Sequence, residues 1–184
     1  MDERCSPILV VSCLLVASAA NAQDQSRLGL TMGYPATVGV IWHVSPALAV
    51  RPEFSFSQAT TTSTAYGSPS YSTDGSAWGV GASALFYVHQ WDKARVYASP
   101  RFLYSRTTTT TTQSSPTGSA SNRWTGNAYA VSGSLGAQYS FARRFGVFGE
   151  AGFGYTDSRT SYPVSETKAT TWATRTAVGV ILYF

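Results

Sequence analysis

The sequence predicts an all-β protein, namely an eight-stranded antiparallel up-and-down transmembrane β-barrel. Three observations predict it. Apolar and polar residues alternate with a period of two in eight segments, the connections between the segments alternate between short and long, and the chain closes on an apolar row ending at Phe184. A period of two gives a strand two distinct faces. Such segments separated by turn residues are typical of a barrel that crosses a membrane.

Each segment carries aliphatic and aromatic residues on one face and Gly, Ser, Thr or charged residues on the other. In the first segment, for example, Leu28, Leu30 and Met32 alternate with Gly29 and Thr31. The expected strands are 27–34, 37–44, 47–57, 77–88, 94–106, 127–141, 145–157 and about 171–184. Because the charged and glycine positions share a face, we expect that face to line the lumen. A soluble barrel with an apolar interior would require the opposite pattern on every strand.

The connections predict which end of the barrel faces outward. Three are short, at 45–46, 90–93 and 142–144, and three are long and rich in Thr, Ser, Gly and Pro, at 58–76, 107–123 and 158–170. Short periplasmic turns and longer external loops are the rule for outer-membrane barrels. The connection at Pro35 is the exception, because it is external and short. Within the second long segment, Thr107–Thr112 favours a ribbon that continues past the membrane, with irregular tips only at Pro69 and Pro116.

Outward-facing aromatic residues collect in two groups, as expected for anchoring at the two membrane interfaces. The group at the loop end contains Tyr34, Phe56, Trp78, Tyr104, Tyr129, Tyr155 and Trp172. The group at the turn end contains Trp42, Phe86, Tyr139, Phe141 and Phe184.

The amino terminus predicts export. An uncharged apolar stretch, Pro7–Ala20, precedes a small-residue cleavage site at Ala22, and it is too short to span a membrane as a helix. We therefore expect residues 1–22 to be a cleaved signal peptide and residues 23–184 to form one barrel domain. A second interpretation stays open, in which Val10–Cys13 is a lipoprotein cleavage box and Cys13 is acylated. Both cysteines, Cys5 and Cys13, lie in the leader, so we expect no disulfide in the barrel.

Composition excludes several classes of partner. The chain has 13 Lys and Arg against 9 Asp and Glu, a net charge of +4, without a basic run longer than Arg143-Arg144, so nucleic acid is not expected. No metal-ligand spacing is present, and we expect no cofactor. Beyond the leader no segment approaches about 18 consecutive apolar residues. A membrane protein without such a segment must be a closed barrel, since lipid tolerates no unpaired backbone group.

Five charged residues are expected to face the lumen near mid-strand: Arg51, Glu53, Arg101, Glu150 and Arg175. Eight strands enclose a lumen just wide enough for side chains. Charges held there must pair or keep water, so we expect a lumenal charge network that plugs the barrel. For Glu150 the candidate partners are Arg101 and Arg175, with Arg101 preferred. An ion path or a ligand site at the same residues remains an alternative.

Catalytic residues are not expected. His43 and His89 are the two histidines, and both are expected at the periplasmic end, away from external lipid. The long loops offer Tyr66, Tyr71 and Tyr162 among Ser and Thr, a composition that suits either adaptable recognition or plain solvated loops.

The last strand carries Val178, Val180, Leu182 and Phe184 on its outward face. An aromatic carboxy terminus on such a strand resembles the assembly signal that Gram-negative bacteria read when they insert outer-membrane barrels. With the leader and the eight alternating strands, the chain resembles the OmpA/OmpX-like superfamily of small outer-membrane β-barrel proteins, without the periplasmic peptidoglycan-binding domain of full OmpA proteins.

That resemblance implies a location in the cell outer membrane, with outer-membrane lipid and the barrel-assembly machinery as partners and an extracellular ligand for the long loops. A structural or surface-interaction role is expected. A narrow porin-like channel and a lipid-modifying enzyme are the alternatives.

Overall fold

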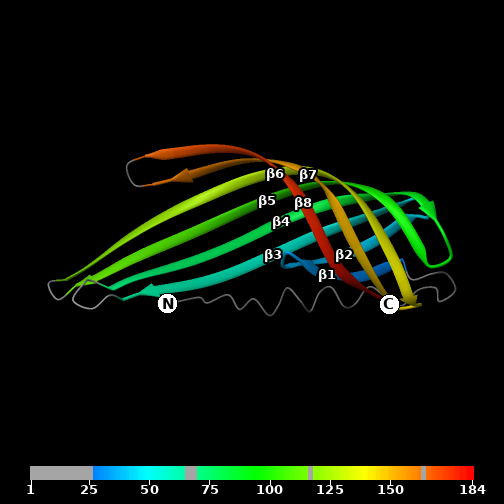
Figure 1. Cartoon of the computed structure of the whole chain (residues 1–184), viewed down its shortest axis with the longest axis horizontal. Coiled ribbons are helices and arrows are strands. Elements are labelled where there is room, and N and C mark those ends of the chain that lie inside the picture. Colours follow the sequence, from blue (N-terminus) through cyan, green and yellow to red (C-terminus); the bar gives the residue numbers. More distant parts are fainter. Residues whose placement is uncertain (1–26, 65–69, 116–117, 163–164) are drawn as a thin grey trace, which may run out of the picture.

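A computed structural model describes residues 27–64, 70–115, 118–162 and 165–184, and in these residues the chain forms one closed barrel (Figure 1). The eight strands are β1 (Leu28–Tyr34), β2 (Thr37–Ser45), β3 (Leu48–Ser63), β4 (Ser70–Gln90), β5 (Ala94–Ser115), β6 (Gly118–Ala142), β7 (Phe145–Ser161) and β8 (Glu166–Tyr183). Each strand pairs antiparallel with the next, and β1 closes the ring on β8. The predicted fold class is confirmed. The described residues contain no helix long and apolar enough to cross a membrane.

The expected leader, residues 1–22 with Cys5 and Cys13, lies outside the described residues.

The strand register keeps the two predicted faces apart, except at three register shifts beside the short turns, at His43/Ser45, Tyr87/His89 and Ser140/Ala142. Met32, for example, lies opposite Val38 on β2 and opposite Val180 on β8, so outward residues meet outward residues. Leu135 is 68% exposed on the outer face, whereas Ile41 is fully buried inside. A large apolar surface on the outside is what a barrel surrounded by lipid requires, and an eight-stranded barrel is narrow enough for side chains to fill its lumen.

Most of the expected long loops are strand, which corrects the predicted element boundaries. β3 runs to Ser63, β5 to Ser115, and the β5–β6 register continues without a break from Arg106–Asn127 up to Ser115–Gly118. The expected ribbon at Thr107–Thr112 is confirmed, while the tips at Pro69 and Pro116 lie outside the described residues. Thr and Ser favour strands, and pairing satisfies the backbone whether or not a face is apolar. The predicted strand boundaries follow the apolar alternation, whereas the strand pairing continues past the point where this alternation ends.

The wall of the barrel is uneven in height. β1 and β2 have 7 and 9 residues, whereas β3 to β8 have 16 to 25. The last β1–β8 pair is Tyr34–Val178 and the last β2–β3 pair is Val38–Phe54. Residues 166–177 of β8 and 55–63 of β3 therefore have a neighbouring strand on one side only. We call this low part of the wall, above the β1–β2 turn, the notch. Strands β3 to β8 stay paired in sequence beyond the notch, β6 with β7 as far as Thr125–Ser161, and Figure 1 shows β3 and β8 as the two edges of this projecting sheet.

The outward aromatic residues form contacts at both ends of the apolar surface. At the end of the long strands, Tyr104 lies with its ring centroid 5.6 Å from that of Trp78 and 5.1 Å from that of Tyr129. At the end of the short turns, the ring of Phe141 lies 4.9 Å from Tyr139 and 6.0 Å from Phe145. We call these ends the extended end and the turn end.

Candidate functional site in the lumen

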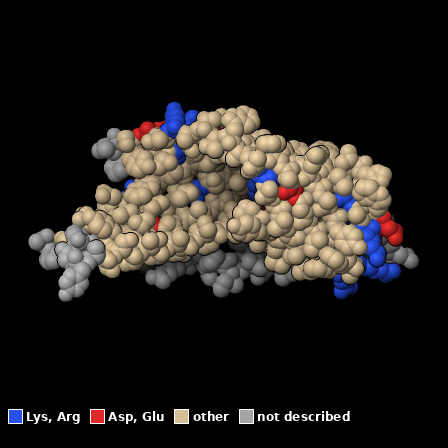
Figure 2. Space-filling model, viewed as in Figure 1, with Lys and Arg blue, Asp and Glu red and all other residues tan. Residues whose placement is uncertain are grey.

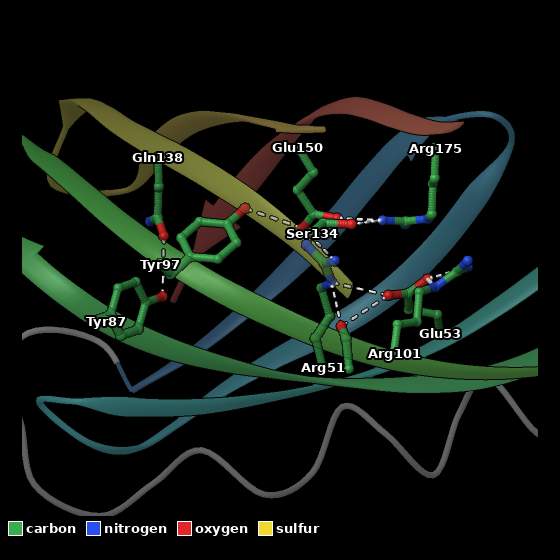
Figure 3. Close-up of polar contacts among 10 residues, drawn as sticks. Arg51, Glu53, Tyr87, Tyr97, Arg101, Ser134, Gln138, Glu150 and Arg175 are labelled. Carbon is green, nitrogen blue, oxygen red and sulfur yellow. Dashed lines mark hydrogen bonds and ion pairs between the residues drawn. The ribbon is translucent and has the colours of Figure 1, made fainter. Parts of the chain in front are cut away.

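The five inward charges lie side by side in the lumen and alternate in sign (Figure 3). Arg101 pairs with Glu53 at 2.7 Å, Glu53 with Arg51 at 3.1 Å, Arg51 with Glu150 at 2.6 Å, and Glu150 with Arg175 at 2.8 Å. We call this continuous series the charge chain. It begins and ends on an arginine.

The strand register brings these residues to a common height. Arg51 of β3 lies opposite Ser83 of β4, which in turn lies opposite Arg101 of β5. On the other side of the lumen, Glu150 lies opposite Ala177 of β8, and Arg175 lies two residues before Ala177 on that strand, toward the extended end. Because the interior of an eight-stranded barrel is narrow, side chains at one height meet across it.

Both carboxylates have all their oxygens paired. In Glu53, Oε1 accepts from Arg51 Nε and Ser83 Oγ, and Oε2 accepts from two nitrogens of Arg101 at 2.9 and 2.7 Å. In Glu150, Oε1 accepts from Arg51 and from the Tyr97 hydroxyl at 3.1 Å, and Oε2 accepts from Arg175. Burying a charge is costly unless it is paired and hydrogen-bonded. This arrangement meets that condition for both glutamates.

The predicted preference of Glu150 for Arg101 is wrong. Arg101 bonds to Glu53, and Glu150 bonds instead to Arg175, the second candidate, and to Arg51, which the sequence does not single out. The β4 residue between Arg51 and Arg101 is Ser83, a small side chain that itself donates to Glu53. Arg101 therefore reaches Glu53 across β4.

Exposure rises toward the two ends of the charge chain. The side chain of Arg51 is 3% exposed, whereas Arg101 is 10% and Arg175 is 18% exposed. The guanidinium of Arg51 also lies 4.9 Å from the centre of the Phe148 ring. With three arginines and two glutamates, the chain has one surplus positive charge, carried at its more exposed ends.

A second polar layer fills the lumen toward the turn end. The Tyr87 hydroxyl donates to Gln138 Oε1 at 3.2 Å, the amide nitrogen of Gln138 donates to the Tyr183 hydroxyl, and His43 Nε2 lies 3.3 Å from that hydroxyl. The guanidinium of Arg95 lies over the Tyr87 ring. Apart from His43, sequence reasoning gave these residues no role, although their inward positions beside short turns carry the signal.

Glycines on the inner face make room for the aromatic rings. A Cβ placed on Gly136 would lie 2.5 Å from the Tyr97 ring, and one on Gly179 would lie 2.6 Å from the Phe148 ring. Because real Cβ contacts are longer than this, the rings occupy space that only glycine leaves free. The lumen is therefore filled on the turn-end side of the charge chain.

The remaining sequence-predicted residues lie as follows. His89 packs against Trp91 at the β4–β5 turn, with ring centroids 4.3 Å apart. Tyr71 and Tyr162 are exposed, Tyr162 lies near Trp124, and Tyr66 is outside the described residues. The expected assembly row lies on the outer face of β8 and the residue that follows it: Val178, Val180, Leu182 and Phe184. Within the described ranges, no three His, Cys, Asp or Glu side chains gather as metal ligands would.

The fold and the two faces together define a small eight-stranded β-barrel of the outer-membrane class. No protein-family profile matches the sequence, and no curated protein matches it. Among solved structures, the chain is similar in fold to a major outer membrane protein from Thermus thermophilus, with a TM-score of 0.60, 12% identity, and coverage of 88% of this chain and 100% of that one.

Two further structures match with lower TM-scores. CarO of Acinetobacter baumannii has a TM-score of 0.43 and 14% identity, with 88% of this chain and 100% of that chain covered. Ail, the attachment invasion locus protein of Yersinia pestis, has a TM-score of 0.41 and 13% identity, with 85% and 92% covered. At such identities the likeness is one of fold.

Proposed function

We propose that this protein is an integral outer-membrane barrel that does not conduct, and that its extended strands serve surface interaction. The observation that carries the proposal is the charge chain. It crosses the lumen with Arg51, Glu53 and Glu150 buried, and the Tyr87–Gln138–Tyr183 layer lies below it. An ion passing through would have to separate paired, buried charges. Leaving one member of a buried ion pair without its partner costs about 3–5 kcal/mol.

The outer surface supports a membrane position with the extended end outside. Beyond the aromatic residues of the extended end, Arg106, Arg159 and Lys168 occupy one row across β5–β8, with Asn127 between the two arginines. Cations just beyond an aromatic interface suit contact with phosphate headgroups. The leader 1–22 and the outward row that ends at Phe184 complete the proposal, as export and assembly signals read by the secretion and barrel-assembly machineries.

The extended strands supply the proposed interaction surface. Of the strands that project beyond the notch, β3–β6 reach farthest, and their faces there are mostly Thr and Ser, with Tyr71 exposed on β4 (Figure 1). Exposed tyrosine among small hydroxyl residues suits adaptable hydrogen bonding. The Trp124–Tyr162 contact adds a second aromatic position, on the neighbouring strands.

Shortening the ribbons tests the surface role directly. Residues 60–74 are replaced by Asn-Gly, which joins the paired residues Ala59 and Gly75 through a two-residue turn, and residues 110–123 are replaced likewise between Thr109 and Trp124. Wild type and the trimmed protein are then compared on an array of immobilised matrix proteins and glycans. We expect the trimmed barrel to keep its heat-modifiable fold and to lose binding. Equal binding by both proteins would contradict the surface role.

The two alternative functions make different demands. A channel needs a continuous water-filled path through the lumen. The side chains of the buried charge chain and of the tyrosine layer interrupt such a path. A lipid-modifying enzyme needs a nucleophile or a general base near external lipid. His43 and His89 instead lie toward the turn end, where His43 contacts Tyr183 and His89 contacts Trp91.

A further inference from the structure

We propose that the recess above the charge chain binds the anionic headgroup of a long-chain amphiphile, such as a fatty-acid carboxylate, whose hydrocarbon chain passes through the notch to the lipid-facing surface. Figure 2 shows a recess between the two edges of the projecting sheet, with Lys or Arg atoms in it. Three features of the described residues carry this proposal: the gap in the wall, the apolar lining of that gap, and the unused donors of the terminal arginines.

The gap follows from the strand ends. Arg175 lies on β8 three residues before Val178, toward the extended end, and Val178 makes the last pair with β1, so this part of β8 has no neighbouring strand on its β1 side. On the opposite side of the notch, β3 continues past Phe54 without a β2 partner. The notch is thus open at the height where the charge chain ends.

The lining of the notch is mainly apolar. It includes residues from both the outer and the inner face of the barrel wall. A hollow of about 340 Å³ lies against the β1–β2 turn and β3. Its outward-facing residues are Met32, Val38, Phe54 and Phe56, and its inward-facing residues are Gly33, Thr37 and Ser55. Ser55 is two residues from Glu53, the partner of Arg101. A hydrocarbon chain in this hollow would contact lipid-facing side chains at one end and approach the charge chain at the other.

The headgroup would complete the alternation of charge. The chain reads arginine, glutamate, arginine, glutamate, arginine, and every glutamate oxygen is already paired. Arg175 donates only through Nη1, to Ser134 and Glu150, and Arg101 only through Nε and Nη2, so each keeps a nitrogen without a hydrogen bond to the described residues. A carboxylate or phosphate is the group that a guanidinium binds best. Figure 3 shows Arg101 and Arg175 at the opposite end of the network from Tyr87 and Gln138.

The apolar lining favours an amphiphile over a small free anion. A small anion would need the two arginines alone and would gain nothing from Phe54 or Phe56. Because every buried methylene group stabilises the bound state, a long chain in the notch should bind far better than a short one with the same headgroup.

The test measures ligand binding to the full folded chain in a non-ionic detergent by native mass spectrometry. The probes are palmitate, palmitate methyl ester and hexanoate. We expect one palmitate per barrel, with the ester and hexanoate each weaker by at least about tenfold. If the ester binds as well as palmitate, the arginines do not bind the headgroup. If hexanoate binds as well as palmitate, the notch does not hold the hydrocarbon chain and the site is one for small anions. Either result would overturn the proposal.

Three variants locate the site. Arg175→Gln should weaken palmitate binding at least about tenfold, whereas Lys93→Gln, in the exposed β4–β5 turn at the other end of the barrel, should leave it unchanged. Thr37→Trp fills the notch without touching the charge chain, so it should weaken the binding of palmitate but not that of hexanoate. Each variant is first checked for the heat-modifiable mobility of a folded barrel. If folded Thr37→Trp binds palmitate like wild type, or Lys93→Gln weakens binding as much as Arg175→Gln, the proposal is wrong.

Discussion

Glu150 is the most constrained residue of the lumen. Its carboxylate has no exposed surface and accepts three hydrogen bonds, from Arg51, Tyr97 and Arg175. Removing one partner of such a group leaves an uncompensated charge in a narrow interior and lowers the stability of the fold strongly, whereas removing both members of a pair lowers it far less. The contribution of the charge chain to stability therefore depends on all its members being paired.

A double-mutant cycle should show which arginine pairs with Glu150. Glu150→Gln and Arg175→Gln, alone and together, should show a coupling free energy of about 1–3 kcal/mol, because the two side chains are in direct contact. The control cycle combines Glu150→Gln with Arg101→Gln and should show a smaller coupling, since Arg101 bonds to Glu53. Urea unfolding in lipid vesicles gives both values. A larger coupling to Arg101 than to Arg175 would contradict the assigned pairing.

Two buried serines offer a matched comparison. Ser83 Oγ accepts from Arg51 and donates to Glu53, whereas Ser99 Oγ has no hydrogen-bond partner among the described residues, and both side chains are nearly fully buried. Ser83→Ala should therefore lower the free energy of unfolding by about 1–3 kcal/mol. Ser99→Ala should leave it unchanged or raise it. The same urea unfolding assay measures both, and an equal loss for the two variants would mean that the Ser83 hydrogen bonds add nothing.

At this scale the sequence identifies the charged residues but not their partners. Alternation places Arg51, Glu53, Arg101, Glu150 and Arg175 on the inner face without knowledge of the register. Pairing across the lumen depends on the relative height of strands that are not neighbours, and on the small residue, Ser83, that lies on β4 between Arg51 and Arg101. Neither quantity appears in the pattern of a single strand.

Among the elements, each strand of the barrel has one face toward lipid and one toward the lumen. Replacing Leu135, which is 68% exposed on the outer face of β6, with Arg should cost about 2–4 kcal/mol near the bilayer midplane. Ser132→Arg, three residues away on the inner face, should cost less. Unfolding in lipid vesicles compares them, and equal penalties would mean that the faces are misassigned.

Gly152 is unsuitable as a second inner-face control, although its inward position alone makes it a natural choice. A Cβ at Gly152 would overlap the Gly133 carbonyl oxygen and crowd Ser134. Any side chain there must displace the β6 backbone, so the loss of stability would report crowding of the strands rather than the polarity of the lumen.

The last strand is proposed to carry the assembly signal. Phe184→Ala should slow insertion and leave precursor in the periplasm, because it removes the aromatic end of the outward row. Tyr183→Ala is not a clean control, since the Tyr183 hydroxyl bonds to Gln138 in the lumen; Val44→Ala, an outward residue of β2, serves better. Cell fractionation and the heat-modifiable band measure the outcome. A normal yield of folded Phe184→Ala barrel would exclude a role as a signal.

For the whole molecule, closure was predictable and the notch was not. The short connection at Pro35 is visible in the sequence, but its consequence depends on how far β3 and β8 continue beyond it. Those continuations are Thr-rich and lack apolar alternation, so sequence reasoning ended the strands at the membrane. The projecting sheet and the recess between its edges, β3 and β8, follow from backbone pairing that has no hydrophobic pattern.

The central claim is that side chains close the lumen, and conductance in planar bilayers tests it most directly. Wild type should show almost no ion current. The double variant Arg51→Ala with Glu150→Ala removes the middle of the charge chain as a pair and keeps Arg101 bonded to Glu53, and it should pass measurably more current once folding is verified. Large, steady single-channel currents from the wild-type protein would contradict the closed lumen and favour the channel instead.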